Sequence, residues 1–317
     1  MVPNVWALVV TAKASRLDLA KFCSFHLDQG AERIFLYLDD SEARTADILS
    51  SIPQIELTVT DETYWKNSNR PSSIENRQSK NAQHAYRRVK SQFPHIQWLG
   101  HIDIDEFIYT EEGVKLGRRL AMQPETCQTI RILPAEYLTP DHEDYQGPDQ
   151  FKILPRRIVD HKEIADHIFP NYGPTLPGGF ISHKAGKVMF RIQDSASKVQ
   201  PKIHNVIIDD SINPRERELS QTHINLTHYH ATSWAHFKEC YKTRRSNGSY
   251  SEELNILKTL DQTTDSGKLE RFFYDHCVAH DQLIKKLKTY DLYRTFDMQF
   301  EKKMLRYFEK SDLVERV

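Results

Sequence analysis

The most informative stretch of the chain is His101-Ile102-Asp103-Ile104-Asp105-Glu106-Phe107. Together with the apolar residues just before it, the stretch predicts a buried strand over residues 97–102 that ends in two aspartates. In an extended backbone, side chains two residues apart point to the same side, so Asp103 and Asp105 are expected to converge. Convergent carboxylates repel each other unless a positive charge lies between them, and a magnesium or manganese ion commonly supplies that charge.

The part of the chain before this stretch alternates strand and helix signals, which is typical of a parallel sheet with crossover helices. Ser15 and Asp18 form a capping box at the start of one helix, and Gly30 ends it. An apolar stripe from Ile74 to Val89 predicts a longer helix. Strands are predicted at residues 6–10, 34–38 and 55–59. The fold class is therefore α/β, with a mixed, largely parallel sheet, and such sheets bind ligands at the carboxyl ends of their strands.

The remainder of the chain has a less regular pattern. It predicts a helix over residues 114–122 and a polar, proline-containing loop over residues 138–150. From Trp234 onward the sequence is charged and helical. Strands are predicted at residues 129–133, 151–154, 188–192, 206–208 and 224–229. We therefore predict one α/β domain over residues 1–232, followed by a C-terminal helical extension over residues 233–317.

The composition excludes several classes of protein. Lys plus Arg number 43 and Asp plus Glu 44, so nothing in the overall charge favours binding to nucleic acid. The four cysteines are scattered and form no CxxC pair, which argues against a structural zinc site and a disulfide framework. The apolar run at residues 5–10 is too short for a signal peptide, and no stretch has the length of a membrane span. A cytoplasmic location is expected.

Two motifs resemble those of a known group of enzymes. The segment Asp103-Ile104-Asp105-Glu106-Phe107, behind its strand and helix pattern, resembles the D-x-D-E-F motif of GT-A fold glycosyltransferases of the family 2-like and family 92-like branch. The segment from His228 to Lys238 is similar to that branch's H-Y-x-x-K-S-x-x-x-F motif, with Thr232 in place of its Lys. Weaker similarities involve an R-Q-x-x-N helix pattern and a basic strand region, carried by Arg77, Gln78 and Asn81 and by Lys184, Lys187, Arg191 and His204.

The resemblance implies a GT-A-like domain that moves a sugar from a nucleoside diphosphate, UDP above all, with inversion. The acceptor would be a hydroxyl of a glycan, a lipid-linked sugar or a surface polysaccharide. It also implies a manganese or magnesium ion with Asp105 as its direct ligand. Asp103 would bind the donor ribose, or the metal through water, and His228 would be the third ligand, with His230 in reserve.

Further donor contacts are expected at the ends of the first two strands. Asp39 and Asp40 would accept hydrogen bonds from the base or ribose, although the same residues suit a turn or a helix cap. Lys13 would lie near the diphosphate, and Arg77 is included among the donor-binding residues. Thr11 begins the turn that stands where the group carries an Asn-Glu pair.

The general base of an inverting transferase has several candidates. Glu136 follows a predicted strand, and Asp141 lies in the polar loop after it. Glu143, Asp144 and His183 are alternatives that sequence alone does not rank. A second open question is a basic helix that would face either solvent or an anionic partner, including a charged glycan or a membrane surface touched peripherally. Its cations are Lys238, Lys242, Arg244 and Arg245.

Two rival functions follow from the same residues. A phosphohydrolase of the haloacid dehalogenase type also uses D-x-D, but there the pair follows the first strand, whereas here it follows the fourth. The other rival is a catalytically degenerate GT-A fold retained as a binding or scaffold protein. The altered turn from Ala12 to Ser15 favours this second rival.

Overall fold

The chain folds into two compact units. The computed structural model describes residues 3–39, 49–155, 161–170, 179–192, 198–219, 223–246 and 267–309. Unit 1 comprises Met1–Leu133, Ala185–Leu226 and Gln299–Val317, and unit 2 comprises Pro134–Lys184 and Thr227–Met298. The units do not coincide with the predicted division at residue 232, which stays a prediction about where a catalytic part would end.

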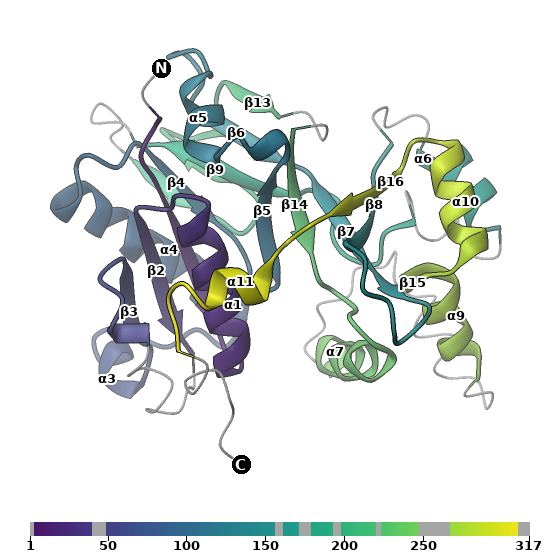
Figure 1. Ribbon diagram of the computed structural model, residues 1–317. Coiled ribbons are helices and arrows are strands. Elements are labelled where there is room, and N and C mark those ends of the chain that lie inside the picture. The colour runs from purple at the N-terminus through teal and green to yellow at the C-terminus, as the bar shows by residue number, and fades with distance from the viewer. Residues whose placement is uncertain are drawn as a thin grey trace. The chain divides into compact units, whose positions relative to one another are not determined.

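Unit 1 is built on a seven-stranded mixed sheet of order β13-β6-β9-β4-β1-β2-β3 (Figure 1). The pairs β4–β1, β1–β2, β2–β3 and β13–β6 are parallel, whereas β9 runs antiparallel to both β4 and β6. The strands are β1 (Trp6–Ala12), β2 (Arg33–Leu38), β3 (Ile55–Val59), β4 (Trp98–His101), β6 (Thr129–Ile132), β9 (Lys187–Arg191) and β13 (Glu216–Glu218). The predicted α/β class with a mixed, largely parallel sheet is confirmed.

Helices cover the sheet because its central strands are apolar on both faces. Every residue of β1 is buried, as expected for a parallel strand between two helical layers. Ala7, Val9, Phe35 and Tyr37 pack against Ala82, Ala85 and Val89 of α4 (Ile74–Gln92), the longer helix that the apolar stripe predicts. These positions alternate along β1 and β2, so the residues between them face the opposite side of the sheet.

The capping signals of the first helix are confirmed. The Ser15 hydroxyl accepts a hydrogen bond from the backbone N–H of Asp18 at the start of α1 (Arg16–Asp28). Gly30 has a φ of 95°, a left-handed conformation that glycine adopts without strain just beyond a helix end.

Shorter elements complete unit 1. Three strands form a small separate sheet, and α11 packs on α1 through contacts such as that between Phe300 and Phe25. The three strands of the small sheet are β10 (Val199–Pro201), β11 (Val206–Ile208) and β12 (Ser211–Ile212). The other short elements are α3 (Glu62–Trp65), β5 (Glu106–Thr110), the 3-10 helix η1 (Glu111–Gly113), α5 (Leu116–Ala121) and α11 (Phe300–Met304). β14 (Ile224–His228) begins in unit 1 and its last residues belong to unit 2.

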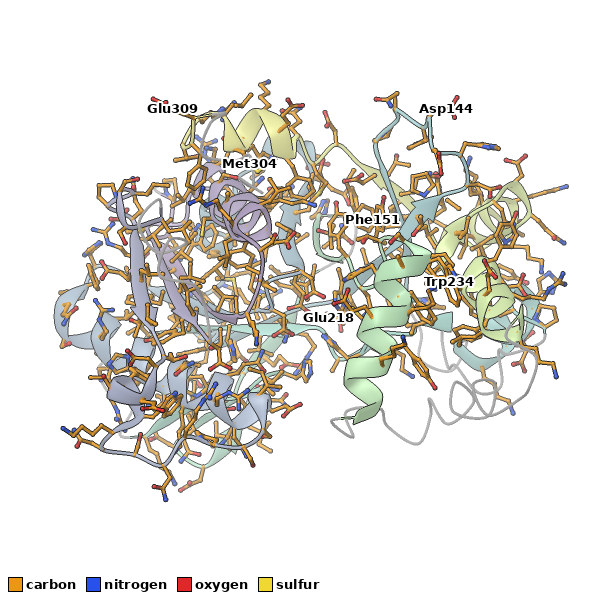
Figure 2. All side chains as sticks on the ribbon, turned by 90° about the horizontal axis from the view of Figure 1, so that it is seen from below. Asp144, Phe151, Glu218, Trp234, Met304 and Glu309 are labelled. Carbon is orange, nitrogen blue, oxygen red and sulfur yellow. The ribbon has the colours of Figure 1, made fainter. Side chains whose placement is uncertain are left out.

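Unit 2 consists of a sheet of order β16-β8-β7-β14 with helices beside it. Phe151 of β8, labelled in Figure 2, packs among aromatic rings from three other segments, Tyr137, Tyr229 and Phe296. The elements are β7 (Pro134–Pro140), β8 (Asp149–Ile153), α6 (His161–Ile168), α7 (Trp234–Ser246), α9 (Gly267–Cys277), β15 (Val278–Ala279), α10 (Asp281–Thr289) and β16 (Tyr293–Phe296).

Two expectations need correction. The predicted loop over residues 138–150 is shorter, because β7 extends to Pro140 and β8 begins at Asp149. The C-terminal part is not purely helical, since β16 pairs antiparallel with β8 and β15 pairs with β7. Among the described helices, none combines the length and the apolar character that a membrane crossing requires.

Candidate functional site

The strand order of unit 1 creates a switch point between β1 and β4. The chain proceeds from β1 outward through β2 and β3 and then returns to β4 on the other side of β1. In open α/β sheets, the carboxyl ends of the strands at such a switch point are the usual place for a bound ligand. Thr11 of β1, Asp39 after β2 and Asp103 after β4 all lie at this edge.

Three side chains of α4 bind these three residues. Asn81 Nδ2 donates to the Thr11 hydroxyl at 2.9 Å, and Gln78 Nε2 donates to Asp103 Oδ1 at 2.7 Å. Arg77 Nε donates to Asp39 Oδ2 at 2.9 Å. Residues at these spacings share one side of a helix, so a single helix face holds the ends of three strands in a fixed relation.

Asp39 is the most fully bound of the expected donor residues. Its side chain is 5% exposed and contacts the guanidinium groups of both Arg70 and Arg77 at 2.9 Å. The Thr60 hydroxyl also donates to Asp39 Oδ1. Asp39 therefore anchors the loop before α4 to the end of β2. A sugar nucleotide bound here would contact the two arginines as readily as the Asp39 carboxylate.

The sequence pattern predicts that the two aspartates of the central motif lie in an extended backbone, and this prediction is wrong. β4 ends at His101, and the residues after it form a turn in which the backbone N–H of Glu106 donates to the carbonyl of Asp103. The Glu106 carboxylate in return accepts a 2.8 Å hydrogen bond from the backbone N–H of Asp103. The close approach of Asp103 to Glu106 thus comes from a turn that binds itself at both ends.

A lysine supplies the positive charge within this turn. Lys187 Nζ lies 2.7 Å from Asp103 Oδ2 and 3.6 Å from Glu106 Oε2, and its side chain is 1% exposed. Burial lowers the pKa of the Lys187 ammonium, but Asp103, Glu106 and Asp105 outweigh that effect and raise the pKa above its ordinary value. Lys187 is therefore charged at neutral pH, and its ammonium offsets one of the two negative charges from within the protein.

His101 completes the surroundings of the turn. Its Nδ1 lies 3.1 Å from the carbonyl oxygen of Lys202. Burial, and after it the charge of Lys187, lowers the pKa of this imidazole to about 4. His101 is neutral at physiological pH and fixes the segment before β11 against the end of β4.

The carboxylates differ in what they can still bind. Both oxygens of Asp103 contact side chains, Gln78 at one and Lys187 at the other, and Glu106 is fully buried. Asp105, at the tip of the turn, is partly exposed. A hard divalent cation prefers carboxylate oxygens that keep access to water and phosphate, so this donor set suits Asp105 as a direct ligand and Asp103 as a partner through water.

Lys13 and Asp40 are the remaining residues that were predicted to contact the sugar nucleotide. Lys13 is exposed beyond the end of β1, and the role predicted for it stays a prediction. Asp40 lies outside the described residues.

Unit 2 contains Glu136, a predicted general base, in a buried ion pair. Lys152 Nζ lies 2.9 Å from Glu136 Oε1, and the side chains are 1% and 4% exposed. The backbone N–H groups of Ile181 and Ser182 and the Ser182 hydroxyl also donate to Glu136. Burial alone raises the pKa of Glu136, but Lys152 and the donors outweigh it and lower the pKa. A carboxylate that is enclosed and stabilised in its charged form is poorly suited to accept a proton from a substrate.

A group of histidines in unit 2 contains the predicted metal ligand His228. The His228 ring lies 5.6 Å from that of His183 and 5.3 Å from that of His230, between ring centroids. His228 and His230 are buried, and His183 is half-buried. These distances are those of packed aromatic rings, and the role of His228 as a metal ligand stays a prediction.

The other predicted base, Asp141, is exposed just after β7 and accepts a hydrogen bond from the Tyr274 hydroxyl at 3.4 Å. On α7, which begins at Trp234 (Figure 2), the Lys238 ammonium lies over the Trp234 ring at 5.0 Å. Lys242 is exposed, and the side chains of Arg244 and Arg245 lie outside the described part of the chain.

Arg70 and Lys187 have contacts in the folded chain that were not predicted from the sequence. Lys187 was grouped with other basic residues by resemblance, yet it is buried at the start of β9, next to the apolar run Val188 to Phe190. A lysine in a buried strand requires an acidic partner, and the acidic residues after β4 were the evident candidates. The sequence therefore contained a signal for the contact between Lys187 and Asp103. Arg70 lies in an irregular segment before α4, where no periodic pattern predicts a contact with Asp39.

Comparisons with known proteins add little to this geometry. No family model matches the chain, and no curated protein matches it. The crystal structure of HddC from Yersinia pseudotuberculosis is similar over 46% of this chain and 67% of that chain, at 10% identity and a TM-score of 0.28. A 4-diphosphocytidyl-2C-methyl-D-erythritolsynthase from Anaerococcus prevotii DSM 20548 is similar over 48% and 60%, at 13% identity and a TM-score of 0.27. The WbbM bifunctional glycosyltransferase in its apo structure is similar over 60% of this chain and 32% of that one, at 10% identity and a TM-score of 0.28.

Proposed function

We propose that this chain is a glycosyltransferase that uses a nucleoside diphosphate sugar, with UDP as the first candidate nucleotide. The acceptor would be a hydroxyl of a glycan, a lipid-linked sugar or a surface polysaccharide, and the transfer would invert the anomeric carbon. The observation that supports this proposal best is the switch-point edge of unit 1. There Thr11, Asp39 and Asp103 end three neighbouring parallel strands and are all held by α4.

Each residue of this edge has a proposed part. Thr11 and Asp39 would line the nucleoside, with Arg70 and Arg77 orienting Asp39, and Lys13 would lie near the diphosphate. Asp40 would contribute to the same contacts. Gln78 and Lys187 would hold Asp103 in one orientation and in its ionised form, ready for the donor ribose.

The metal dependence is a further part of the proposal. Asp105 would be the direct ligand of a manganese or magnesium ion, Asp103 would act through water, and His228 would be a ligand by the motif resemblance. Such an ion, when bound, neutralises the charge that develops on the departing nucleoside diphosphate. The general base stays open among Asp141, Glu143, Asp144 and His183, and the enclosed Glu136 is the weakest candidate.

The test is thermal unfolding with UDP, GDP or ADP, each with and without manganese. A ligand at a hundred times its Kd stabilises the folded chain by about 2.7 kcal/mol, which is easily seen as a rise in Tm. We expect the largest rise with one nucleotide and manganese together. Asp105→Ala should lose the manganese-dependent part of this rise, whereas the control Glu125→Ala, an exposed acid elsewhere in unit 1, should keep it. Retention of the full effect in Asp105→Ala would refute the site assignment.

A second candidate is a nucleotide-binding protein that catalyses no transfer. The observation in its favour is Lys187, whose ammonium already supplies a positive charge to Asp103 and Glu106 without a metal ion. The same measurement separates the two, because this protein would gain stability from a nucleotide whether or not manganese is present. A chain that responds to no nucleotide would contradict both proposals.

A further inference from the structure

Unit 1 contains an open groove of about 870 Å³ whose charge is entirely positive. It lies between one face of α4 and the segment around β10. The groove is lined by Asn69, Arg70, Pro71, Asn76, Ser79, Lys80, Gln83, Tyr86, Arg87, Lys90, Lys198, Val199, Gln200, Pro201 and Lys202. Six of these residues are lysine or arginine, and none of these described lining residues is acidic. In a chain with 43 basic and 44 acidic residues, such a separation of charge indicates a site for an anion.

The two walls of the groove follow the periods of their backbones. On α4, positions 76, 80, 83, 87 and 90 recur every three or four residues and form one stripe, with positions 79 and 86 beside it. Around β10, the side chains of Lys198, Gln200 and Lys202 alternate with the buried Val199 and Pro201. The cations therefore stand on both walls of a groove that follows α4 for roughly 20 Å, at about 1.5 Å per helical residue.

Two cations, one on each wall, are well placed to bind a ligand. Arg87 of α4 and Lys202 beyond β10 are exposed, and neither side chain forms an ion pair within the described part of the chain. Lys198 by contrast lies 3.0 Å from Asp210, in a pair so exposed that water competes with it.

The groove reaches the candidate donor site at one end. Arg70 lines the groove and also contacts Asp39 at 2.9 Å. Lys202 lines it as well, and its carbonyl oxygen lies 3.1 Å from Nδ1 of His101, two residues before Asp103. A long molecule in the groove would thus lie with one end near the edge where a donor sugar is expected.

The uncharged lining favours a saccharide over a nucleic acid. Amide and hydroxyl side chains stand between the cations, and such groups pair with sugar hydroxyls. They are Asn69, Asn76, Ser79, Gln83 and Gln200. The single aromatic residue of the lining, Tyr86, is largely buried, so the groove offers no platform on which bases could stack.

We propose that this groove binds an anionic glycan, a chain of sugars that bear carboxylate or phosphate groups. That this glycan is the acceptor rests on the proposed glycosyltransferase function, whereas the binding itself does not.

The experiment measures binding of a fluorescent oligogalacturonate to the full chain, without nucleotide or metal, at low and moderate salt. The comparison ligands are a neutral maltooligosaccharide of equal length, a thymidine oligonucleotide and vesicles that contain phosphatidylserine. We expect the uronate oligomer to bind, more weakly as salt rises, and the neutral oligomer not to bind. The variant Arg87→Glu/Lys202→Glu should weaken the uronate complex by roughly tenfold or more, because each change replaces an attraction by a repulsion.

A matched control carries the same change of charge outside the groove. Arg118→Glu/Lys302→Glu alters exposed residues of α5 and α11 and should leave uronate binding within about twofold of the unaltered chain. Equal losses in both double variants would mean that only net charge matters and would overturn the proposal, as would absence of uronate binding. Tighter, groove-dependent binding of the oligonucleotide or the vesicles would overturn the assignment to a glycan.

The outcomes for the groove and for the proposed function are distinguishable. The double groove variant should keep its Tm response to nucleotide with manganese, since neither side chain belongs to the switch-point edge. A chain that binds the uronate oligomer through the groove but responds to no nucleotide would retain the glycan site and lose the transferase proposal.

Discussion

Replacement of Lys187 by methionine tests whether the acidic turn depends on its internal cation. The side chains of Lys187 and Glu106 are 1% and 0% exposed, and that of Asp103 is 27% exposed. Removal of one partner from a buried ion pair typically costs about 3–5 kcal/mol, because the charge left behind has lost both water and its counter-ion. At roughly 2–4 °C per kcal/mol for a domain of about 150–250 residues, Lys187→Met should lower the Tm by roughly ten degrees.

The assay is urea or thermal unfolding at pH 7 to 9. The raised pKa of Lys187 means that its contribution is complete below the unfolded value and is lost only as pH rises through the folded value, beyond this window. Lys187→Met/Glu106→Gln should recover part of the loss, because the glutamine leaves no uncompensated buried charge. A loss below about 1 kcal/mol in Lys187→Met, or no recovery in the double variant, would refute the reasoning.

Manganese adds a second comparison to the same variant. If a divalent cation binds the carboxylates that Lys187 now neutralises, the ion should stabilise Lys187→Met more than the unaltered chain. Equal stabilisation would mean that the ammonium and the ion act on separate groups, with Asp105 as the separate ligand.

Two further predictions concern other buried titratable groups. Burial lowers the pKa of His26 to about 3 and that of His101 to about 4, so unfolding takes up protons below pH 6.5. The free energy of unfolding, measured in urea, should therefore fall by about 2 kcal/mol per histidine between pH 6.5 and 5, at roughly 1.4 kcal/mol per pH unit, and His26→Gln should reduce that slope; an unchanged slope would contradict the assignment. In unit 2, Lys152→Met should cost about 3–5 kcal/mol by the same measurement, and Lys152→Met/Glu136→Gln should cost less; equal costs would show that Glu136 does not need its partner.

Local signals predicted the first half of unit 1 well. The strands there are continuous apolar runs, and Ser15 and Gly30 mark the ends of α1 through hydrogen bonding and backbone conformation that depend only on near neighbours. The stripe on α4 was equally readable, since its apolar residues follow the period of the helix. These features need no knowledge of distant parts of the chain.

The misread elements are those whose partners lie far along the sequence. β16 has only four residues, too few for a clear periodic pattern, and is a strand because Tyr293 to Phe296 pair with β8, which lies more than a hundred residues earlier. The end of β7 was likewise assigned to a loop, although Thr139 and Pro140 pair with β15. Pairing over such separations is set by tertiary packing, which propensity does not report.

The candidate site illustrates the same division in its chemistry. From the sequence we predicted acidic residues that need a positive charge nearby. The same prediction placed them in an extended strand and assigned the positive charge to a metal ion. In the folded chain the acids approach through a turn, and the first positive charge they meet is Lys187, delivered by an antiparallel strand. A metal ion and a lysine can both offset the negative charge of these carboxylates. An experiment can tell them apart, because only the ion can be removed by a chelator. If nucleotide binding survives chelation but fails in Lys187→Met, the ammonium supplies the charge that this edge of the sheet requires.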